Sequence, residues 1–133
     1  MITIQLWGKE FPLCLTVAAL DRINEKCGGV DGLMTFLNGG PEKDYSQMVV
    51  NTAWTLGLLI EEGEENRLVC SRFDSSVDNG NRRAVPDQTA ILQALTIASA
   101  IKYRPAVLAA VSESMSREIE AVYSKKKATE EEQ

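Results

Sequence analysis

The fold class of this chain follows from residues 87–123, which read DQTAILQALTIASAIKYRPAVLAAVSESMSREIEAVY. Apolar side chains recur there in steps of three and four, which places them on one stripe of an amphipathic helix. The stripe consists of Ile91, Leu95, Ala98, Ile101, Leu108, Val111, Met115, Ile119 and Val122. A stripe of this kind has to pack against another element, so we predict a mainly α-helical chain.

The start of this stretch and one internal residue refine the prediction. Asp87 starts the helix, because its side chain can accept hydrogen bonds from the free amides of the first turn. Pro105 has no amide hydrogen and disfavours helical backbone angles at Arg104. The stretch is therefore either one kinked helix or two helices that meet near Arg104.

Length and composition indicate one folded domain. The chain has 133 residues, of which 44% are apolar, and this content is ordinary for a globular protein. We predict a single, mainly α-helical domain over residues 1–124, in which an N-terminal hairpin over residues 2–15 packs on a bundle of about four to five helices. Residues 125–133 begin with three lysines and end in acidic residues, and we expect a disordered tail there.

Charge and hydropathy exclude two classes of partner. A net charge of −5 argues against binding a nucleic-acid backbone over a broad surface, which requires clustered Lys and Arg. No run approaches the roughly 20 apolar residues that span a bilayer. We therefore expect a cytoplasmic protein that binds neither nucleic acid nor membrane.

The first fifteen residues are predicted to form a β-hairpin. One register puts six apolar residues on a single face, in the pairs Ile2 with Leu15, Ile4 with Leu13, and Leu6 with Phe11. A two-residue turn at Gly8-Lys9 would place Pro12 in a hydrogen-bonded pair, although proline has no donor. We therefore predict a four-residue loop over residues 7–10. Trp7 at its tip either folds back over the hairpin or faces solvent.

Two helices are expected next. Thr16 can cap a helix over residues 17–27, whose inner stripe would be Val17, Leu20, Ile23 and Cys27. Gly28 supplies the left-handed residue that commonly ends a helix. A short helix over residues 30–37 follows, and the Asn-Gly-Gly-Pro sequence after it stops the helix.

A third helix is expected to begin near Asp44 or Ser46 and to end near Glu62. Its apolar arc is wide enough to predict deep burial, and Gly57 would let another backbone approach closely. The acidic residues 61–65 are interpreted as a solvated helix end. Residues 67–85 are the least regular segment, which is typical of a functional or disordered loop. Within it, residues 68–70 either continue the third helix or form a short strand.

The residue types present limit the possible chemistry. The chain contains no histidine, which removes Ser-His and Cys-His nucleophiles and the usual zinc sites. Three widely spaced cysteines, without a Cys-x-x-Cys motif, are predicted to be reduced thiols. Neither a dinucleotide-binding motif nor a P-loop is present. We therefore expect no enzyme, no metal and no cofactor.

Three segments resemble the tail assembly chaperones of long-tailed, non-contractile phages: ITIQLWGKEFPL (residues 2–13), LDRINEKCG (20–28) and LMTFL (33–37). In that family a short hairpin with a Gly-Lys-Glu-like turn precedes a helix with a Glu-Lys-x-Gly-like stop, and a mostly helical bundle follows. The likeness covers residues 2–60, and beyond them only helix content and length agree.

The resemblance implies a non-enzymatic protein of the host cytoplasm. Such chaperones bind the helical tape-measure protein, help tail-tube protein polymerise around it, self-associate along it, and leave before the virion is complete. The residues expected to bind the partner are Trp7, Phe11, Leu56, Leu59, Met115, Ile119 and Val122. Residues 106–123 are expected to project from the body and to make most of these contacts. The alternative is a head–tail completion or connector protein that stays in the particle.

Overall fold

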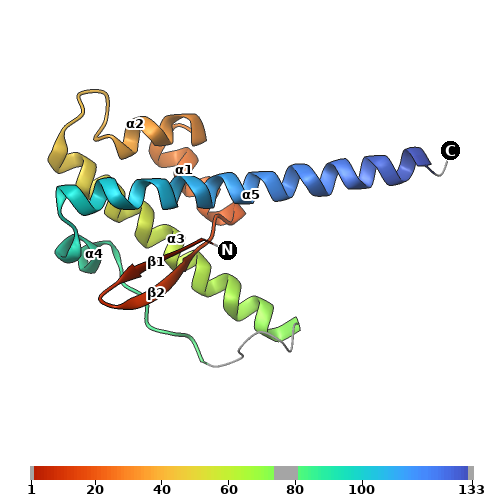
Figure 1. The fold of residues 1–133 in the computed structure, drawn as a ribbon, viewed down its shortest axis with the longest axis horizontal. Coiled ribbons are helices and arrows are strands. Elements are labelled where there is room, and N and C mark those ends of the chain that lie inside the picture. Colours follow the sequence, from red (N-terminus) through yellow and green to blue (C-terminus); the bar gives the residue numbers. More distant parts are fainter. Residues whose placement is uncertain (1, 74–80, 132–133) are drawn as a thin grey trace.

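The computed structural model describes residues 2–73 and 81–131, and of residues 116–131 it describes the backbone alone. The elements are β1 (Ile2–Leu6), β2 (Lys9–Leu13), α1 (Val17–Cys27), the 3₁₀ turn η1 (Val30–Gly32), α2 (Leu33–Leu37), α3 (Tyr45–Phe73), α4 (Gln88–Ala94) and α5 (Ile97–Glu131). Figure 1 shows the hairpin against the helices. The predicted class, mainly α with an N-terminal hairpin packed on helices, is confirmed.

Helix α3 is the element on which the others pack. Between Asn51 and Ile60 every residue except Trp54 is buried, so the helix is covered on almost all sides. A helix that is apolar around most of its circumference belongs inside a fold. Accordingly α3 contacts α1, α2, α4, α5 and β2. The predicted deep burial of the third helix is confirmed.

Helix α3 is longer than the sequence suggested. It continues past the expected end at Glu62 to Phe73, so residues 68–70 continue the helix and the acidic residues 61–65 lie inside it. Repulsion among these carboxylates is offset because three of them have partners. These pairs are Glu62 with Thr16, Glu64 with Arg67, and Glu65 with Arg82. The interpretation of residues 61–65 as a solvated helix end is therefore wrong.

The hairpin has a different register from the predicted one. Ile2 pairs with Leu13, Ile4 with Phe11 and Leu6 with Lys9, which leaves Trp7 and Gly8 as a two-residue turn. Both turn residues have positive φ, 52° and 74°, and such a turn follows the right-handed twist of paired strands. The pair beside a two-residue turn is hydrogen-bonded and the pairs then alternate, so Pro12 still lies in a non-bonded pair, opposite Thr3. The predicted four-residue loop is wrong, but the constraint from Pro12 is met.

Helix α1 begins and ends as predicted. The Thr16 side chain accepts from the amide of Ala19, and Gly28 ends the helix in the left-handed region at φ 75°. The predicted inner stripe is partly wrong. Ile23 is fully buried, but Val17 is 70% exposed and Ala19 is buried instead. The helix is therefore rotated slightly from the orientation that its largest apolar residues indicate.

The long C-terminal stretch breaks ten residues earlier than Pro105. Asp87 caps α4 through the amide of Ala90, as predicted, and α4 ends at an extended Leu95. Thr96 and Ser99 then exchange side-chain bonds to each other's amides, a reciprocal cap that starts α5.

Pro105 lies inside α5, and the helix passes through it. Pro105 and Ile101 are both on the exposed side, so the Ile101 carbonyl that loses its amide partner is open to water. Of the two alternatives, a helix boundary near Arg104 is therefore wrong, and one helix continues through this point. The side of α5 packed on the body extends beyond the proline to Val107, Ala110 and Val111, and Figure 1 shows the helix continuing past the body.

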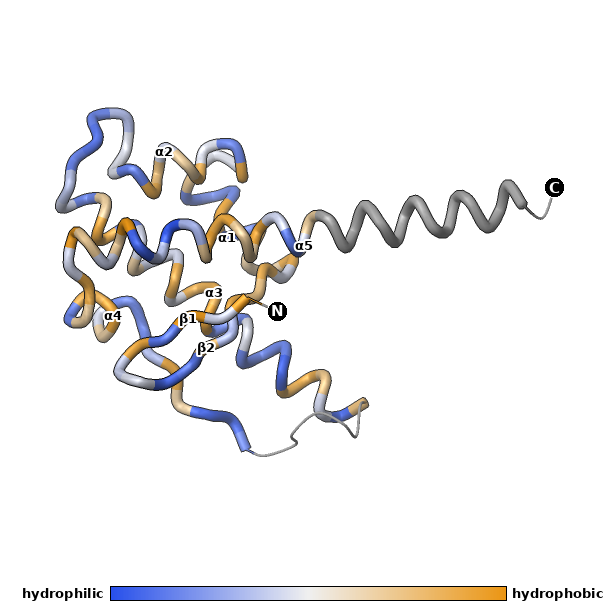
Figure 2. Tube along the Cα trace, in the orientation of Figure 1, coloured by the Kyte–Doolittle hydropathy of each residue, from blue (hydrophilic) through white to orange (hydrophobic). Residues whose placement is uncertain are grey.

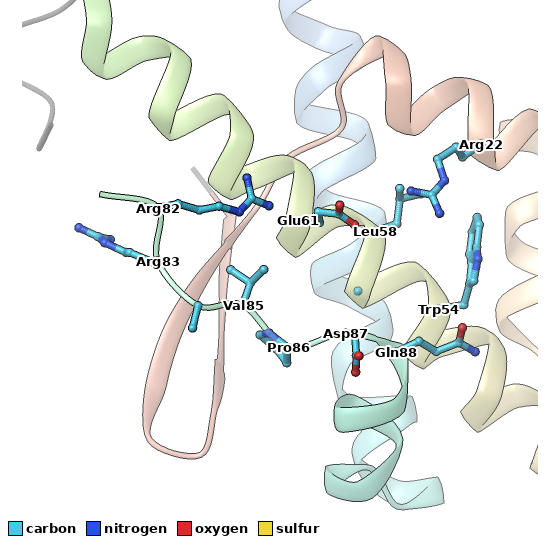
Figure 3. Close-up of a pocket in the computed structure, with 12 residues that line it drawn as sticks. Arg22, Trp54, Leu58, Glu61, Arg82, Arg83, Val85, Pro86, Asp87 and Gln88 are labelled. Carbon is cyan, nitrogen blue, oxygen red and sulfur yellow. The ribbon is translucent and has the colours of Figure 1, made fainter. Parts of the chain in front are cut away.

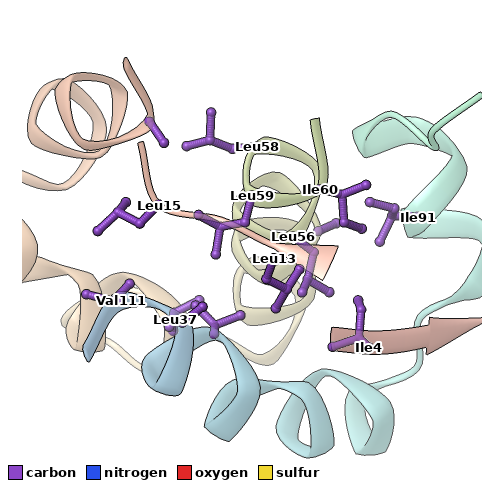
Figure 4. Packing of buried hydrophobic residues seen from close by; sticks show 14 of the residues in the cluster. Ile4, Leu13, Leu15, Leu37, Leu56, Leu58, Leu59, Ile60, Ile91 and Val111 are labelled. Atoms are coloured by element: carbon purple, nitrogen blue, oxygen red, sulfur yellow. The ribbon is translucent and has the colours of Figure 1, made fainter. Parts of the chain in front are cut away.

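The core lies where α3, α5, α4 and the hairpin meet. Figure 4 shows Leu56, Leu59 and Ile60 of α3 among Ile4, Leu13, Ile91 and Val111 from the surrounding elements. Figure 2 colours the chain by hydropathy and shows hydrophilic residues in the connections before α3 and before α4.

The hairpin lies unusually close to α3. The amide of Cys14 donates to the carbonyl of Leu59 at 3.1 Å, although that carbonyl belongs to a helix. At Gly63 a Cβ atom would lie 2.5 Å from the carbonyl oxygen of Pro12, so only glycine fits there. The sequence predicted a close approach at Gly57 as well. A Cβ atom added there would lie 3.4 Å from the backbone nitrogen of Gln88, which is an ordinary van der Waals contact.

No helix in the described part of the chain is long and apolar enough to cross a membrane. The backbone of α5 is described as far as Glu131. The predicted domain limit at residue 124 and the predicted tail over residues 125–133 stay predictions.

Candidate interaction surface

Helix α5 carries partly exposed apolar residues along one flank, beside its buried side. Ile97, Ile101 and Met115 are 47%, 49% and 45% exposed, and Leu108 between them is half-buried and packs against the core cluster. At about 100° per residue this row lies roughly a quarter turn from Ala100, Val107 and Val111, which are in the core. An amphipathic helix normally has one apolar face, so a further, partly exposed row of apolar residues marks a candidate interaction surface. We call Ile97, Ile101, Leu108 and Met115 the α5 stripe.

The spacing within the α5 stripe suits another helix. Ile101, Leu108 and Met115 are seven residues apart, the repeat with which helices pack along each other. Ile97 and Met115 are 18 residues apart in sequence, and at about 1.5 Å per residue the stripe is about 27 Å long. A partner helix of similar length could cover the whole stripe.

A small apolar socket lies at the C-terminal end of the stripe. It has a volume of about 130 Å³ and is lined by Leu15, Thr16, Val17, Leu20, Val30, Ser114 and Met115. The two hydroxyls at its rim already have partners within the chain. Thr16 donates to Glu62, and Ser114 donates to the carbonyl of Leu15. The socket therefore offers apolar contacts and suits an aliphatic or aromatic side chain.

Two predicted partner-binding residues lie on the hairpin. Trp7 is 57% exposed, so of the two alternatives its ring faces solvent. It also has a left-handed backbone, which costs about 1–2 kcal/mol for a residue other than glycine. Phe11 is half-buried and packs against the core cluster. Trp7 is thus available to a partner, whereas Phe11 mainly holds the hairpin on the body.

The structure moves two predicted partner-binding residues into the interior. Leu56 and Leu59 are fully buried, because α3 is covered on the side where the sequence allowed a free face. We therefore assign them to the core as a correction. Met115 is exposed as expected. The side chains of Ile119 and Val122 lie outside the described residues, so their assignment stays a prediction.

A buried carboxylate was missed in the sequence. Glu64 is only 3% exposed, and it accepts from Arg67 and from the amide of Arg83. The side-chain bond from Arg67 is the main cause that lowers the pKa of Glu64 below its usual value, while burial acts in the opposite direction. The only sequence signal is a Glu and an Arg three residues apart, and such pairs are common on exposed helices.

A hollow lies between α1, α3 and the segment before α4. It has a volume of about 660 Å³, and Figure 3 shows Arg22 and Trp54 on one side of it and Val85 on the other. Phe36 packs edge-on against the Trp54 ring at 5.5 Å between centroids, and Lys26 Nζ lies 5.8 Å from that ring. Acidic and basic side chains both line the hollow, so its charge does not select one class of ligand.

Metal ligands do not gather in the described part of the chain. Over residues 2–73 and 81–115 no three Cys, Asp or Glu side chains are close enough to hold a metal ion. The three cysteines, all within this part, form no disulfide. Burial raises the pKa of the Cys27 thiol, which makes the reactive thiolate rarer at neutral pH.

Comparison with known protein families, with curated proteins and with solved structures found no match.

Proposed function

We propose that this chain is a tail assembly chaperone of a long-tailed, non-contractile phage. It binds helical segments of the tape-measure protein in the host cytoplasm, keeps them soluble and supports polymerisation of the tail-tube protein around them. It acts through apolar contacts, without catalysis or a cofactor, and self-associates along the tape measure.

The α5 stripe is the observation that carries this proposal. Ile101, Leu108 and Met115 repeat every seven residues and are partly or largely open to solvent. A long tape-measure helix with an apolar face would aggregate through that face. Binding of the face to the α5 stripe would keep the helix soluble. In the sequence, Ile119 and Val122 belong to the same apolar period as Leu108 and Met115.

The N-terminal half supports the same proposal. The resemblance implies a short hairpin, then a helix that stops at a glycine, then a helical bundle. The chain has β1 and β2 around a tight turn, then α1 ending at Gly28, then α2 and α3. Trp7 at the hairpin tip is a further exposed apolar residue, outside the α5 stripe, that a partner could contact.

Co-expression with the tape-measure protein of the same genome tests the proposal. We expect the wild-type chain to raise the soluble fraction of the tape-measure protein and to co-purify with it. Ile101→Glu should weaken this binding about tenfold or more, since a lost apolar contact and a charge placed in an apolar interface together remove more than ~1.4 kcal/mol.

Val69→Glu provides the matched control. Val69 is on α3, is 49% exposed like Ile101, and undergoes the same change of charge. If the wild-type chain fails to solubilise the tape-measure protein, the chaperone proposal is wrong. Mass spectrometry of purified particles addresses the alternative, since a chaperone should be absent from them and a head–tail completion protein present.

A further inference from the structure

Residues 81–87 form an extended segment that crosses α3 beside the hairpin, and we call it the strap. Residues 81–84 are exposed, and only Val85 and Pro86 are half-buried. Within the described residues, no backbone-to-backbone hydrogen bond outside the helices and strands involves residues 81–86. The strap therefore depends on side chains to hold it in place.

Glu64 is the centre of the contacts that hold the strap. Its carboxylate accepts from the amide of Arg83 at 2.8 Å, and on the helix side it accepts from Arg67 Nε at 3.1 Å. Arg67 in turn donates to the carbonyl of Asn81 at 3.1 Å. One buried ion pair thus binds the strap at two backbone positions. A second, exposed pair joins Arg82 to Glu65.

The strap separates two hollows along α3. On the hairpin side a pocket of about 490 Å³ is lined by Phe11, Pro12, Ile60 and Val85 together with polar residues at its rim. On the other side is the larger hollow of about 660 Å³, next to Trp54 and Leu58. Figure 3 shows Val85 and Pro86 of the strap standing between α3 and the hairpin.

We propose that the strap is a lid latched by Glu64, and that its release joins the two hollows into one groove along α3 while the helices stay folded. The core of α3 rests on contacts that do not include the strap, among them Leu56 and Leu59 with Ile4 and Leu13. Opening breaks the bonds of Arg83 and Asn81 to the Glu64–Arg67 pair, the Arg82–Glu65 pair and the contacts of Val85, and leaves these core contacts of α3 in place. This device is independent of the proposed chaperone function.

Charged side chains from three elements surround the Glu64 carboxylate. On α3 they are Arg67 and Glu65, on the strap Arg82 and Arg83, and on the hairpin Lys9 and Glu10. Cations thus surround Glu64 from the helix and the strap, whereas Glu10 is the acid that the hairpin contributes to the same pocket. Removing Glu64 takes away the acceptor that Arg67 and the backbone amide of Arg83 share.

Amide hydrogen exchange measured residue by residue tests the latch. In Glu64→Ala we expect the Arg83 amide to exchange at least about tenfold faster than in the wild type, because its acceptor is gone. The amides of Leu56 and Leu59 should keep their protection. The matched control is Glu65→Ala, the same change at the exposed neighbouring pair, and there the Arg83 amide should change less than about twofold.

Three results would overturn the proposal. Unchanged exchange at Arg83 in Glu64→Ala would mean that Glu64 is no latch. Equal loss of protection at Arg83, Leu56 and Leu59 would mean that Glu64 holds the core and not a lid. If the variant does not fold, the wild type decides. Local opening exposes little surface, so in the wild type the exchange rate of the Arg83 amide should not change at low concentrations of denaturant. A rate that rises with denaturant as steeply as that of the Leu59 amide would refute the lid.

Discussion

Replacing Gly63 with alanine should push the hairpin away from α3. The added Cβ would lie 2.5 Å from the Pro12 carbonyl oxygen, whereas contacts between carbon and oxygen are normally about 3.3 Å or longer. One backbone therefore has to move by about 0.8 Å. Movement of the hairpin would also stretch the bond from the Cys14 amide to the Leu59 carbonyl, which is 3.1 Å long.

The expected magnitude combines three effects. Overpacking costs about 1–3 kcal/mol, and the weakened hydrogen bond costs up to about 1 kcal/mol. The higher helix propensity of alanine returns about 1 kcal/mol. Gly63→Ala should therefore lower the free energy of unfolding by up to about 3 kcal/mol, or the Tm by up to about 12 °C for a chain of this size.

Urea unfolding followed by circular dichroism measures this difference, and Gly57→Ala is the matched control. Gly57 is on the same helix, but its added Cβ would lie 3.4 Å from the Gln88 nitrogen and 3.6 Å from Ile91 Cδ1. Because these contacts are ordinary, Gly57→Ala should be as stable as the wild type or up to about 1 kcal/mol more stable, through the higher helix propensity of alanine. If Gly63→Ala is as stable as Gly57→Ala, the hairpin does not lie against α3 in the way described.

Three further predictions test the core, the buried carboxylate and a cap. Leu59→Ala should cost about 2–5 kcal/mol in urea unfolding, whereas Met115→Ala on the exposed stripe should cost less than about 1 kcal/mol. The folded-state pKa of Glu64 is lowered, so its contribution is present above the usual glutamate pKa and is lost as the pH falls through the folded-state value. The stability difference between wild type and Glu64→Gln should therefore shrink in acid, and a difference that stays constant with pH would contradict the ion pair. Thr16→Ala should cost about 1–2 kcal/mol, measured by thermal unfolding, because it removes both the cap of α1 and the bond to Glu62, and an unchanged Tm would refute the cap.

The candidate interaction surface was only partly predictable. Met115 and Ile101 belong to an apolar period that is visible in the sequence, and both are exposed. The same kind of period on the third helix indicated Leu56 and Leu59, which are fully buried. Periodicity shows which residues share a face, but it cannot show whether that face is covered, because the cover comes from distant segments.

The local signals in the sequence determined where several elements begin and end. Thr16, Gly28 and Asp87 each act within about one turn of their own helix, through bonds or backbone angles that need no other segment. For the same reason the class of the fold followed from the helical period alone. The reciprocal cap of Thr96 and Ser99 is a local signal too, and it was overlooked in favour of Pro105.

Tertiary structure alone decided the length of α3, the register of the hairpin and the burial of Glu64. The acidic run stays helical because Thr16, Arg67 and Arg82 supply partners, two of them from segments far away in the sequence. Gly63 can be nothing larger because a carbonyl from the hairpin occupies the space of a side chain. The contacts of α3 with the hairpin and with the segment before α4 join residues 17 to 51 positions apart, from Glu65 and Arg82 to Pro12 and Gly63, and no local pattern encodes such distances.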